Sequence, residues 1–291
     1  MNLRLLLPQS NALPDCATHR LEGIQSRKIE KHHMDAPLLN KMCFMIGPHR
    51  SGSSVVRAVL DAHPSIVMGS ELGRQNFYND IIGGATRDAL LTRIVTQERN
   101  IGKNYTSQRI EKAGGAGLYR QAIPGTWQGR HRELKVIGDK SGPWIGAFAA
   151  ARPDFESVLK SFFKVPIFYV HTVRNPWDNL ATMKLVKQDV HVFERWCRQT
   201  EVIRETVAKR RVHTVHMDDL SHDPEHEIEQ LYRFLDLARP QKIVGACAAH
   251  IFEKPKKRAQ EVKWTDAEIE IVQRLISELS WLSRYPENPD G

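Results

Sequence analysis

The residues best suited to chemistry lie in a turn of small side chains, 47–54, which reads Gly-Pro-His-Arg-Ser-Gly-Ser-Ser. The apolar run from Met42 to Ile46 leads into this turn and predicts a buried strand. Apolar residues follow the turn at helical spacing, namely Val55, Val56, Val59 and Leu60. A strand, a glycine turn and a helix in this order can bind phosphate, because the N–H groups of the turn and the helix N-terminus point at one anion.

The spacing of Gly47 and Gly52 matches a P-loop, GxxxxGK[ST], but the lysine of that motif is missing. Ser53 stands in its place, and the cation of the turn is Arg50, three residues earlier. In a P-loop the lysine reaches the β- and γ-phosphates of ATP, and the Ser or Thr after it holds Mg²⁺. We therefore predict that this turn binds a different anion.

The turn and its continuation resemble the 5′-phosphosulfate loop of sulfotransferases, enzymes that use 3′-phosphoadenosine-5′-phosphosulfate (PAPS). The string RSGSS…LDAHP…G-x-E is most similar to protein-tyrosine sulfotransferases and their bacterial relatives. The resemblance implies that Glu71, two residues after Gly69, is the general base. The donor-binding residues that it implies in the turn are Gly47, Pro48, His49, Arg50, Ser51, Gly52, Ser53 and Ser54. The alternative is an incidental glycine turn before a helix, and the extension of the match to Glu71 argues against it.

A second resemblance lies at the end of the apolar strand predicted from Pro166 to Val173. Arg174, and Thr182 eight residues later, are similar to the arginine and the hydroxyl with which sulfotransferases hold the 3′-phosphate of the donor. A guanidinium fork matches phosphate oxygens, and a helix after the strand can present the hydroxyl beside it. The family more often has Ser at the position of Thr182. The alternative is that Arg174 is a strand-end residue in an ion pair with Asp178.

Two lysines complete the implied site. Lys140, in Gly-Asp-Lys-Ser, resembles a lysine that tyrosine sulfotransferases place against the sulfuryl group, and its alternative is an ordinary solvated charge. Lys254 resembles a lysine of the C-terminal loop over the nucleotide, and its alternative is a basic surface run that could equally attract nucleic acid. Met217 stands where the family has a tyrosine that helps hold adenosine, so the chain departs from the family pattern there.

These residues need a fold that brings several strand ends together. Strands and helices alternate along the chain, which predicts an α/β fold with a parallel sheet and helices on both faces. The resemblance implies a three-layer fold of the P-loop type, in which helices flank the parallel sheet. It also implies an insertion of helices and loops at 73–132 on the acceptor side. We expect a poorly ordered leader at 1–40, the catalytic domain at 41–285 and a tail at 286–291. Strands are predicted at 42–46, 66–68, 134–137, 166–173 and 212–217.

Composition sets broad limits on partners and location. The chain has 291 residues, of which 41% are hydrophobic, and a net charge of +8. A basic balance suits an anionic ligand, nucleic acid or an acidic lipid surface and does not choose among them. No apolar run approaches the ~20 residues of a membrane span, so we expect a soluble, cytoplasmic protein without a transmembrane segment. The cysteines form no CxxC pair, and His213 and His216 would point to opposite faces of a strand, so we expect no metal.

The interpretation that unites these features is a sulfotransferase that moves a sulfuryl group from PAPS to the hydroxyl of a tyrosine, sugar, lipid or small molecule. The resemblance implies that Arg50, Lys140 and the turn N–H groups neutralise the charge that develops on the bridging oxygen, while Glu71 deprotonates the acceptor. PAPS is the cofactor expected, with adenosine 3′,5′-bisphosphate as its product. If Glu71 is not the base, His49 and His171 are the next candidates.

Two alternatives come from other functional classes. One is a P-loop kinase of a small molecule, which the missing lysine disfavours. The other is a non-catalytic nucleotide-binding protein of the same fold, which the presence of Glu71 and Lys140 disfavours. As partners we expect a hydroxyl-bearing acceptor and no nucleic acid, and we leave a homodimer open.

Overall fold

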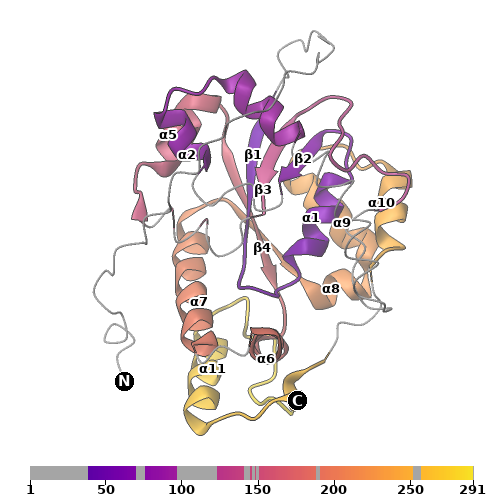
Figure 1. The fold of residues 1–291 in the computed structure, drawn as a ribbon. Coiled ribbons are helices and arrows are strands. Elements are labelled where there is room, and N and C mark those ends of the chain that lie inside the picture. The colour runs from indigo at the N-terminus through magenta and orange to yellow at the C-terminus, as the bar shows by residue number, and fades with distance from the viewer. Residues whose placement is uncertain are drawn as a thin grey trace. The chain divides into compact units, whose positions relative to one another are not determined.

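The fold is built on a parallel five-stranded sheet in the order β2-β3-β1-β4-β5 (Figure 1). The strands are β1 (Lys41–Ile46), β2 (Ile66–Gly69), β3 (Val136–Asp139), β4 (Ile167–Val173) and β5 (Val212–His216). This computed structural model describes residues 39–69, 76–96, 123–140, 145, 148, 151–187, 191–251 and 257–290, which fall within one compact unit of the chain, 36–291. The predicted α/β class with a parallel sheet is confirmed.

Helices pack on both faces of the sheet, as Figure 1 shows. The helices are α1 (Ser53–Asp61), α2 (Asn76–Ile82), a helix at 87–96, α5 (Phe155–Phe163), α6 (Pro176–Lys187), α7 (Val192–Lys209), α8 (Met217–His222), α9 (Pro224–Phe234), α10 (Gln241–Ala248), the 3₁₀ turn η2 (Ala259–Glu261) and α11 (Asp266–Glu278). Alternate side chains of β1 enter two cores: Cys43 packs with α1, α9 and α10, and Phe44 packs with α5 and α7. Burial on both faces explains why the strand reads as a continuous apolar run.

β4 and α6 form the segment that carries the predicted 3′-phosphate residues. All seven residues of β4 are buried, including the polar His171 and Thr172 near its end. The helix α6 begins with Pro176, a residue suited to the first helical position because its missing N–H has no partner there in any case. The side chain of Asn175 accepts the N–H of Trp177 at 2.9 Å and so stabilises this helix start. The strand end and the helix start are therefore both specified locally.

Two differences from the predicted elements affect the site. β3 runs from Val136 to Asp139 rather than over 134–137, because its pairing with β1 begins at Lys41 opposite Val136. The last strand ends at His216, and Met217, predicted as the final residue of that strand, begins helix α8 instead. Met217 is buried at 4% exposure, and its side chain belongs to the hydrophobic core.

Some predicted segments lie partly or wholly outside the described residues. The leader does so over 1–38, and the 73–132 insertion does so except for 76–96 and 123–132. The proposed tail begins at Pro286, whose carbonyl accepts the indole N–H of Trp177 at 2.9 Å. In the part of the chain that is described, no helix has the length and apolar character needed to cross a bilayer.

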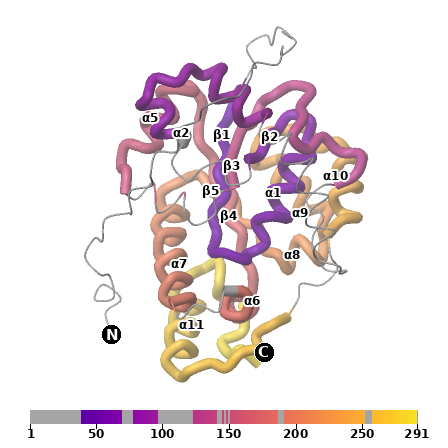
Figure 2. Tube along the Cα trace, in the orientation of Figure 1, coloured from indigo at the N-terminus to yellow at the C-terminus, as the bar shows by residue number. Residues whose placement is uncertain are grey.

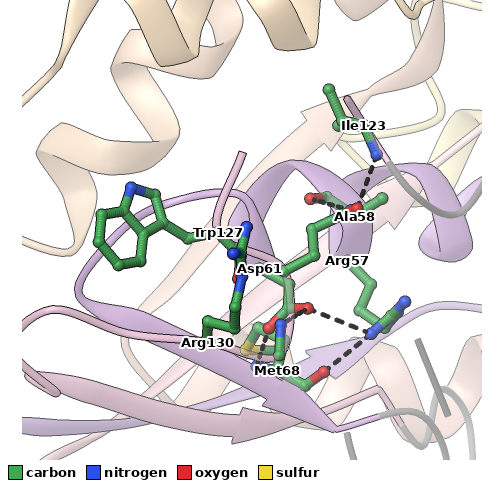
Figure 3. Close-up of polar contacts among 9 residues, drawn as sticks. Arg57, Ala58, Asp61, Met68, Ile123, Trp127 and Arg130 are labelled. Atoms are coloured by element: carbon green, nitrogen blue, oxygen red, sulfur yellow. Dashed lines mark hydrogen bonds and ion pairs between the residues drawn. The ribbon is translucent and has the colours of Figure 1, made fainter. Parts of the chain in front are cut away.

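A buried ion pair on α1 fastens the end of β2 (Figure 3). Arg57 and Asp61 are one helical turn apart, with 3.8 Å between Nη1 and Oδ2. Arg57 donates to the carbonyl of Met68 at 3.0 Å, and Asp61 accepts the N–H groups of Met68 at 2.8 Å and Gly129 at 2.9 Å. Burial raises the pKa of Asp61, and the charge of Arg57 and the two N–H groups oppose that rise. The pair thus joins the helix after the glycine turn to the strand that precedes Glu71.

Removing one partner of this pair should destabilise the fold strongly. Asp61→Ala takes away the acceptor of two buried N–H groups and the charge that faces Arg57, so the free energy of unfolding should fall by about 3–5 kcal/mol in urea denaturation. The matched control is Asp219→Ala, which breaks the more exposed pair with Arg284 and should cost about 0–1 kcal/mol. Similar losses in the two variants would contradict this role of the buried pair.

Candidate functional site

The glycine turn lies where the connections of the sheet diverge. The chain leaves β1 toward β2 on one side, whereas the neighbouring strand β4 continues to β5 on the other side. In parallel sheets the crevice between such diverging loops, outside the carboxyl ends of the strands, is where ligands bind. Ile46 pairs with His171, so the ends of β1 and β4 are adjacent, and the indigo turn after β1 in Figure 2 lies near the start of α6.

The backbone conformation favours glycine at both glycines of the motif, and at Gly47 a close contact requires it as well. Gly52 has a φ of 94° and Gly47 a φ of 154°, in the positive range that favours glycine. A Cβ on Gly47 would lie 2.5 Å from the hydroxyl of Thr172, and one on Gly52 would lie 2.7 Å from Cγ of Met217. Arg50, which is exposed, also has a positive φ of 67°, a conformation that non-glycine residues adopt seldom and mostly at functional turns.

Met217 occupies the position where the family resemblance expects a tyrosine. Its side chain lies directly against Gly52 and is buried. The methionine therefore supports the turn by packing against it. This packing contact gives the sequence departure a structural role, since a flexible thioether fills the irregular space beside a residue that has no side chain.

Hydrogen bonds from β4 and from the helices hold the turn in place. The hydroxyls of Ser51 and Thr172 are 2.7 Å apart. The N–H of His49 donates to the side-chain oxygen of Gln199 at 3.3 Å, and the N–H of Ser51 donates to the carbonyl of Pro48 at 3.3 Å. These two N–H groups therefore already donate hydrogen bonds within the protein. We accordingly place the predicted anion site nearer the start of α1.

The first N–H groups of α1 lie directly after the turn, at Ser53 and Ser54. Ser53 and Ser54 begin the helix, and the N–H groups of a first helical turn have no carbonyl partner inside the helix. Gly52, at the N-cap, offers no side chain to satisfy them. With the partial positive charge of the helix end, these groups can bind an anion.

Arg174 and Thr182 meet as the sequence predicts. Nη1 of Arg174 donates to the hydroxyl of Thr182 at 3.2 Å, and that hydroxyl donates to the backbone carbonyl of Asp178 at 2.7 Å. The alternative for Arg174 was an ion pair with Asp178. Instead, the buried carboxylate of Asp178 accepts the backbone N–H groups of Arg258 and Ala259, so it ties α6 to the C-terminal segment.

The remaining predicted site residues are Lys140, Glu71 and Lys254. Lys140 follows β3 directly, and its N–H donates to the carbonyl of Gly69 at 2.9 Å, so it lies beside the end of β2. Glu71 and Lys254 fall outside the described residues. Their roles stay predictions, although Glu71 follows a strand end that the structure places next to Lys140.

A small cavity lies behind the turn, between β4, α6, α7 and the C-terminal segment. Its volume is about 20 Å³, which suits about one water molecule and is far too small for a nucleotide. Its lining includes Pro48, His171, Arg174, Asn179, Thr200 and Trp281. The cavity therefore does not hold a whole nucleotide, although Arg174 contributes to its wall.

His171, a candidate base from the sequence, lines that cavity from β4. Its ring lies edge-on to Trp281, and Nδ1 is 3.4 Å from the hydroxyl of Thr214. Burial, together with the nearby His216, lowers the pKa of His171 to about 3. The imidazole is therefore neutral at pH 7, and so low a pKa makes it a poor general base.

Sequence reasoning missed the residues that position the turn from α6 and α7. Asn179 donates to the carbonyl of His49, and Gln199 accepts its N–H. Both lie inside helices and match no motif, and they are 130 and 150 residues away from the turn in the chain. No signal in a single sequence connects positions so far apart. Across the described segments, no group of three His, Cys, Asp or Glu side chains is arranged to hold a metal ion.

Comparison with protein families gives a match over part of the chain. Residues 154–274 match the family described as "Sulfotransferase domain". This segment includes β4, α6 and the pair of Arg174 and Thr182, and it is less than half of the chain. The predicted resemblance to sulfotransferases is confirmed over this segment, and no comparison favours the kinase alternative. Among curated proteins none matches the chain.

Several solved sulfotransferases are similar in structure. A sulfotransferase domain from the curacin biosynthetic pathway is 17% identical, covers 85% of this chain and 99% of its own, and has a TM-score of 0.45. The sulfotransferase STF1 from Mycobacterium tuberculosis H37Rv is 15% identical, with coverages of 83% and 77% and a TM-score of 0.46. A mouse sulfotransferase complexed with PAP is 13% identical, with coverages of 82% and 85% and a TM-score of 0.42. Because all three TM-scores are below 0.5, the functional conclusion rests on the family match and the site geometry.

The buried His171 should make stability depend on pH in a defined direction. Its pKa of about 3 in the folded chain lies below the value of about 6.5 for an unperturbed histidine, so the unfolded chain binds one more proton between these values. Stability is then fully present above about pH 6.5 and is lost as the pH falls toward 3, by about 1.4 kcal/mol per pH unit from this group.

The test compares His171→Asn with the unchanged protein in urea denaturation at pH 4.5, 5.5 and 6.5. The variant should show a shallower dependence of the free energy of unfolding on pH, by roughly one proton. The asparagine amide can keep a polar contact to Thr214, so the comparison isolates the titration from the loss of packing. Identical slopes for both proteins would contradict a neutral, buried His171.

Proposed function

We propose that this chain, whose residues 154–274 match a sulfotransferase domain, transfers a sulfuryl group from PAPS to a hydroxyl acceptor. One observation carries the proposal. A glycine turn without the ATP-type lysine and an arginine–hydroxyl pair, Arg174 with Thr182, follow the adjacent strands β1 and β4 at one edge of the sheet. Two anion sites at neighbouring strand ends suit a nucleotide with phosphate groups on both its 5′ and 3′ sides.

The proposed binding roles follow from the chemistry of each side chain. The first N–H groups of α1, at Ser53 and Ser54, bind the 5′-phosphosulfate together with the exposed Arg50 of the turn. The guanidinium of Arg174 is oriented by its hydrogen bond to Thr182, and its other N–H groups bind the 3′-phosphate. Lys254 would cover the nucleotide from the C-terminal loop.

The proposed reaction is an in-line transfer at sulfur. A bond forms between the acceptor oxygen and sulfur while the bond from sulfur to the bridging oxygen of the donor breaks, and Glu71 takes the proton of the acceptor. Arg50 and Lys140 stabilise the negative charge that develops on the leaving phosphate. These cations would supply the positive charge that Mg²⁺ provides in enzymes that use ATP.

The acceptor is a hydroxyl compound, and the donor-side residues leave its class open among tyrosine, sugar, lipid and small metabolite. We place the enzyme in the cytoplasm as an expectation from the sequence. The decisive experiment is transfer from radiolabelled PAPS to a panel of these four acceptor classes, with the sulfated product identified by mass. Absence of both transfer and slow PAPS hydrolysis would count against the proposal.

The nucleotide preference should distinguish this function from a kinase. The protein should bind adenosine 3′,5′-bisphosphate much more tightly than ADP or ATP in calorimetry, because ATP has no 3′-phosphate for Arg174. Arg174→Ala should weaken bisphosphate binding by roughly 1.5–3 kcal/mol, the range for hydrogen bonds to charged groups, and change turnover of bound donor much less. Equal affinities for the three nucleotides would favour the kinase.

The role of Glu71 can be separated from a structural one. If it is the general base, Glu71→Gln should leave the melting temperature and the donor affinity nearly unchanged while turnover falls by ~10²–10⁴. If it instead holds the turn in shape as a partner of Arg50 or Arg74, the same change should lower stability and donor binding together. Turnover retained in Glu71→Gln would remove the catalytic assignment, and His49 would then be the next residue to test.

A further inference from the structure

Asn179 forms a buried bridge between the glycine turn and helix α7. It lies on α6 and is 1% exposed. Its side-chain nitrogen donates to the backbone carbonyl of His49 at 2.7 Å, and its side-chain oxygen accepts the indole N–H of Trp196 at 2.8 Å. Both atoms of the amide are therefore used, each in a short hydrogen bond to a different part of the chain.

The chemistry of the two partners fixes the direction of this bridge. An indole N–H can only donate, and a backbone carbonyl can only accept. The amide oxygen must then face Trp196 and the amide nitrogen must face the turn. Among residues of this size, only asparagine offers a donor and an acceptor on opposite sides of one planar group, so the position demands this residue type.

The same helix also carries the hydroxyl that meets Arg174. Thr182 follows Asn179 by three residues, which places the two side chains on neighbouring parts of one helical face. Asn179 holds the 5′ turn and Thr182 contacts the guanidinium assigned to the 3′-phosphate. A single rigid element therefore touches both halves of the donor site.

We propose that Asn179 is a positioning residue that sets the place of the 5′-phosphosulfate turn relative to the 3′-phosphate pair. This inference rests on the proposed function. Asn179 is buried, so its proposed effect on the donor is indirect. It acts through the carbonyl of His49, whose N–H is held in turn by Gln199 from α7. With both backbone groups of His49 bound, the turn keeps the shape that presents the first N–H groups of α1 to the anion.

The test uses two variants and three nucleotides. Asn179→Leu keeps the branching at Cγ and the neutrality but removes both hydrogen bonds, and Asn179→Asp keeps the acceptor for Trp196 but loses the donor to the turn. Calorimetry compares adenosine 3′,5′-bisphosphate, adenosine 5′-monophosphate and adenosine 3′-monophosphate. We expect both variants to bind the two 5′-phosphorylated nucleotides about tenfold more weakly, roughly the worth of one well-made hydrogen bond, and the 3′-monophosphate within about twofold of the unchanged protein.

Two control variants separate positioning from general destabilisation. Thr182→Val should show the opposite pattern, with weaker binding of the two 3′-phosphorylated nucleotides. Thr206→Val removes a buried hydrogen bond to the carbonyl of Val202 on α7. It should lower the melting temperature without changing the ratio of the three affinities. The affinities of all variants are measured at a temperature where thermal melting shows each of them to be folded.

The outcomes also separate this inference from the proposed function. If the unchanged protein binds the bisphosphate as expected but the Asn179 variants weaken all three nucleotides equally, or none of them, the positioning role is overturned and the proposed function stands. If the unchanged protein binds none of the three nucleotides, both are overturned. A loss confined to the 5′-phosphorylated nucleotides supports the positioning role.

Discussion

The parallel pairing of β1 with β4 is the constraint on which the rest of the site depends. Because Ile46 pairs with His171, the residues after the two strand ends must share the same small space. Gly47 approaches Thr172 so closely that a methyl group does not fit, and the hydroxyls of Ser51 and Thr172 are in hydrogen-bond contact. A shift of this pairing by one residue would reverse the faces of β4 and move Arg174 away from the turn.

Around that pairing, buried and half-buried polar groups support the site on two sides. On one side, Arg57 and Asp61 join α1 to the end of β2. On the other, Asn179 and Gln199 hold the turn from α6 and α7. Buried polar groups that are satisfied specify one arrangement, because any displacement leaves them without partners in a medium of low dielectric. Catalysis by positioning and charge needs such rigidity, since misplacement by about 1 Å can cost about 100-fold in rate.

The departures from the sulfotransferase pattern have local explanations in the packing. Met217, in place of a tyrosine, is buried against Gly52, so its side chain stabilises the turn by packing. Thr182, in place of the more usual serine, still presents its hydroxyl to Arg174. The extra methyl leaves that contact intact because the hydroxyl also donates to the carbonyl one turn earlier in α6, which fixes its direction.

The sequence alone determined the class of the fold and the five strands to within two residues at each end, because apolar periodicity is a local property. The meeting of Arg174 with Thr182 was expected from the family resemblance of that segment, and their hydrogen bond agrees with it. The sequence did not determine which N–H groups of the turn are occupied, nor that β3 begins at Val136, nor that Met217 begins a helix against Gly52. It also contained no sign of Asn179, whose contact with His49 spans 130 residues. Such contacts arise only when the sheet order brings β1, β4 and the helices α6 and α7 together, and no periodicity within a segment encodes that arrangement.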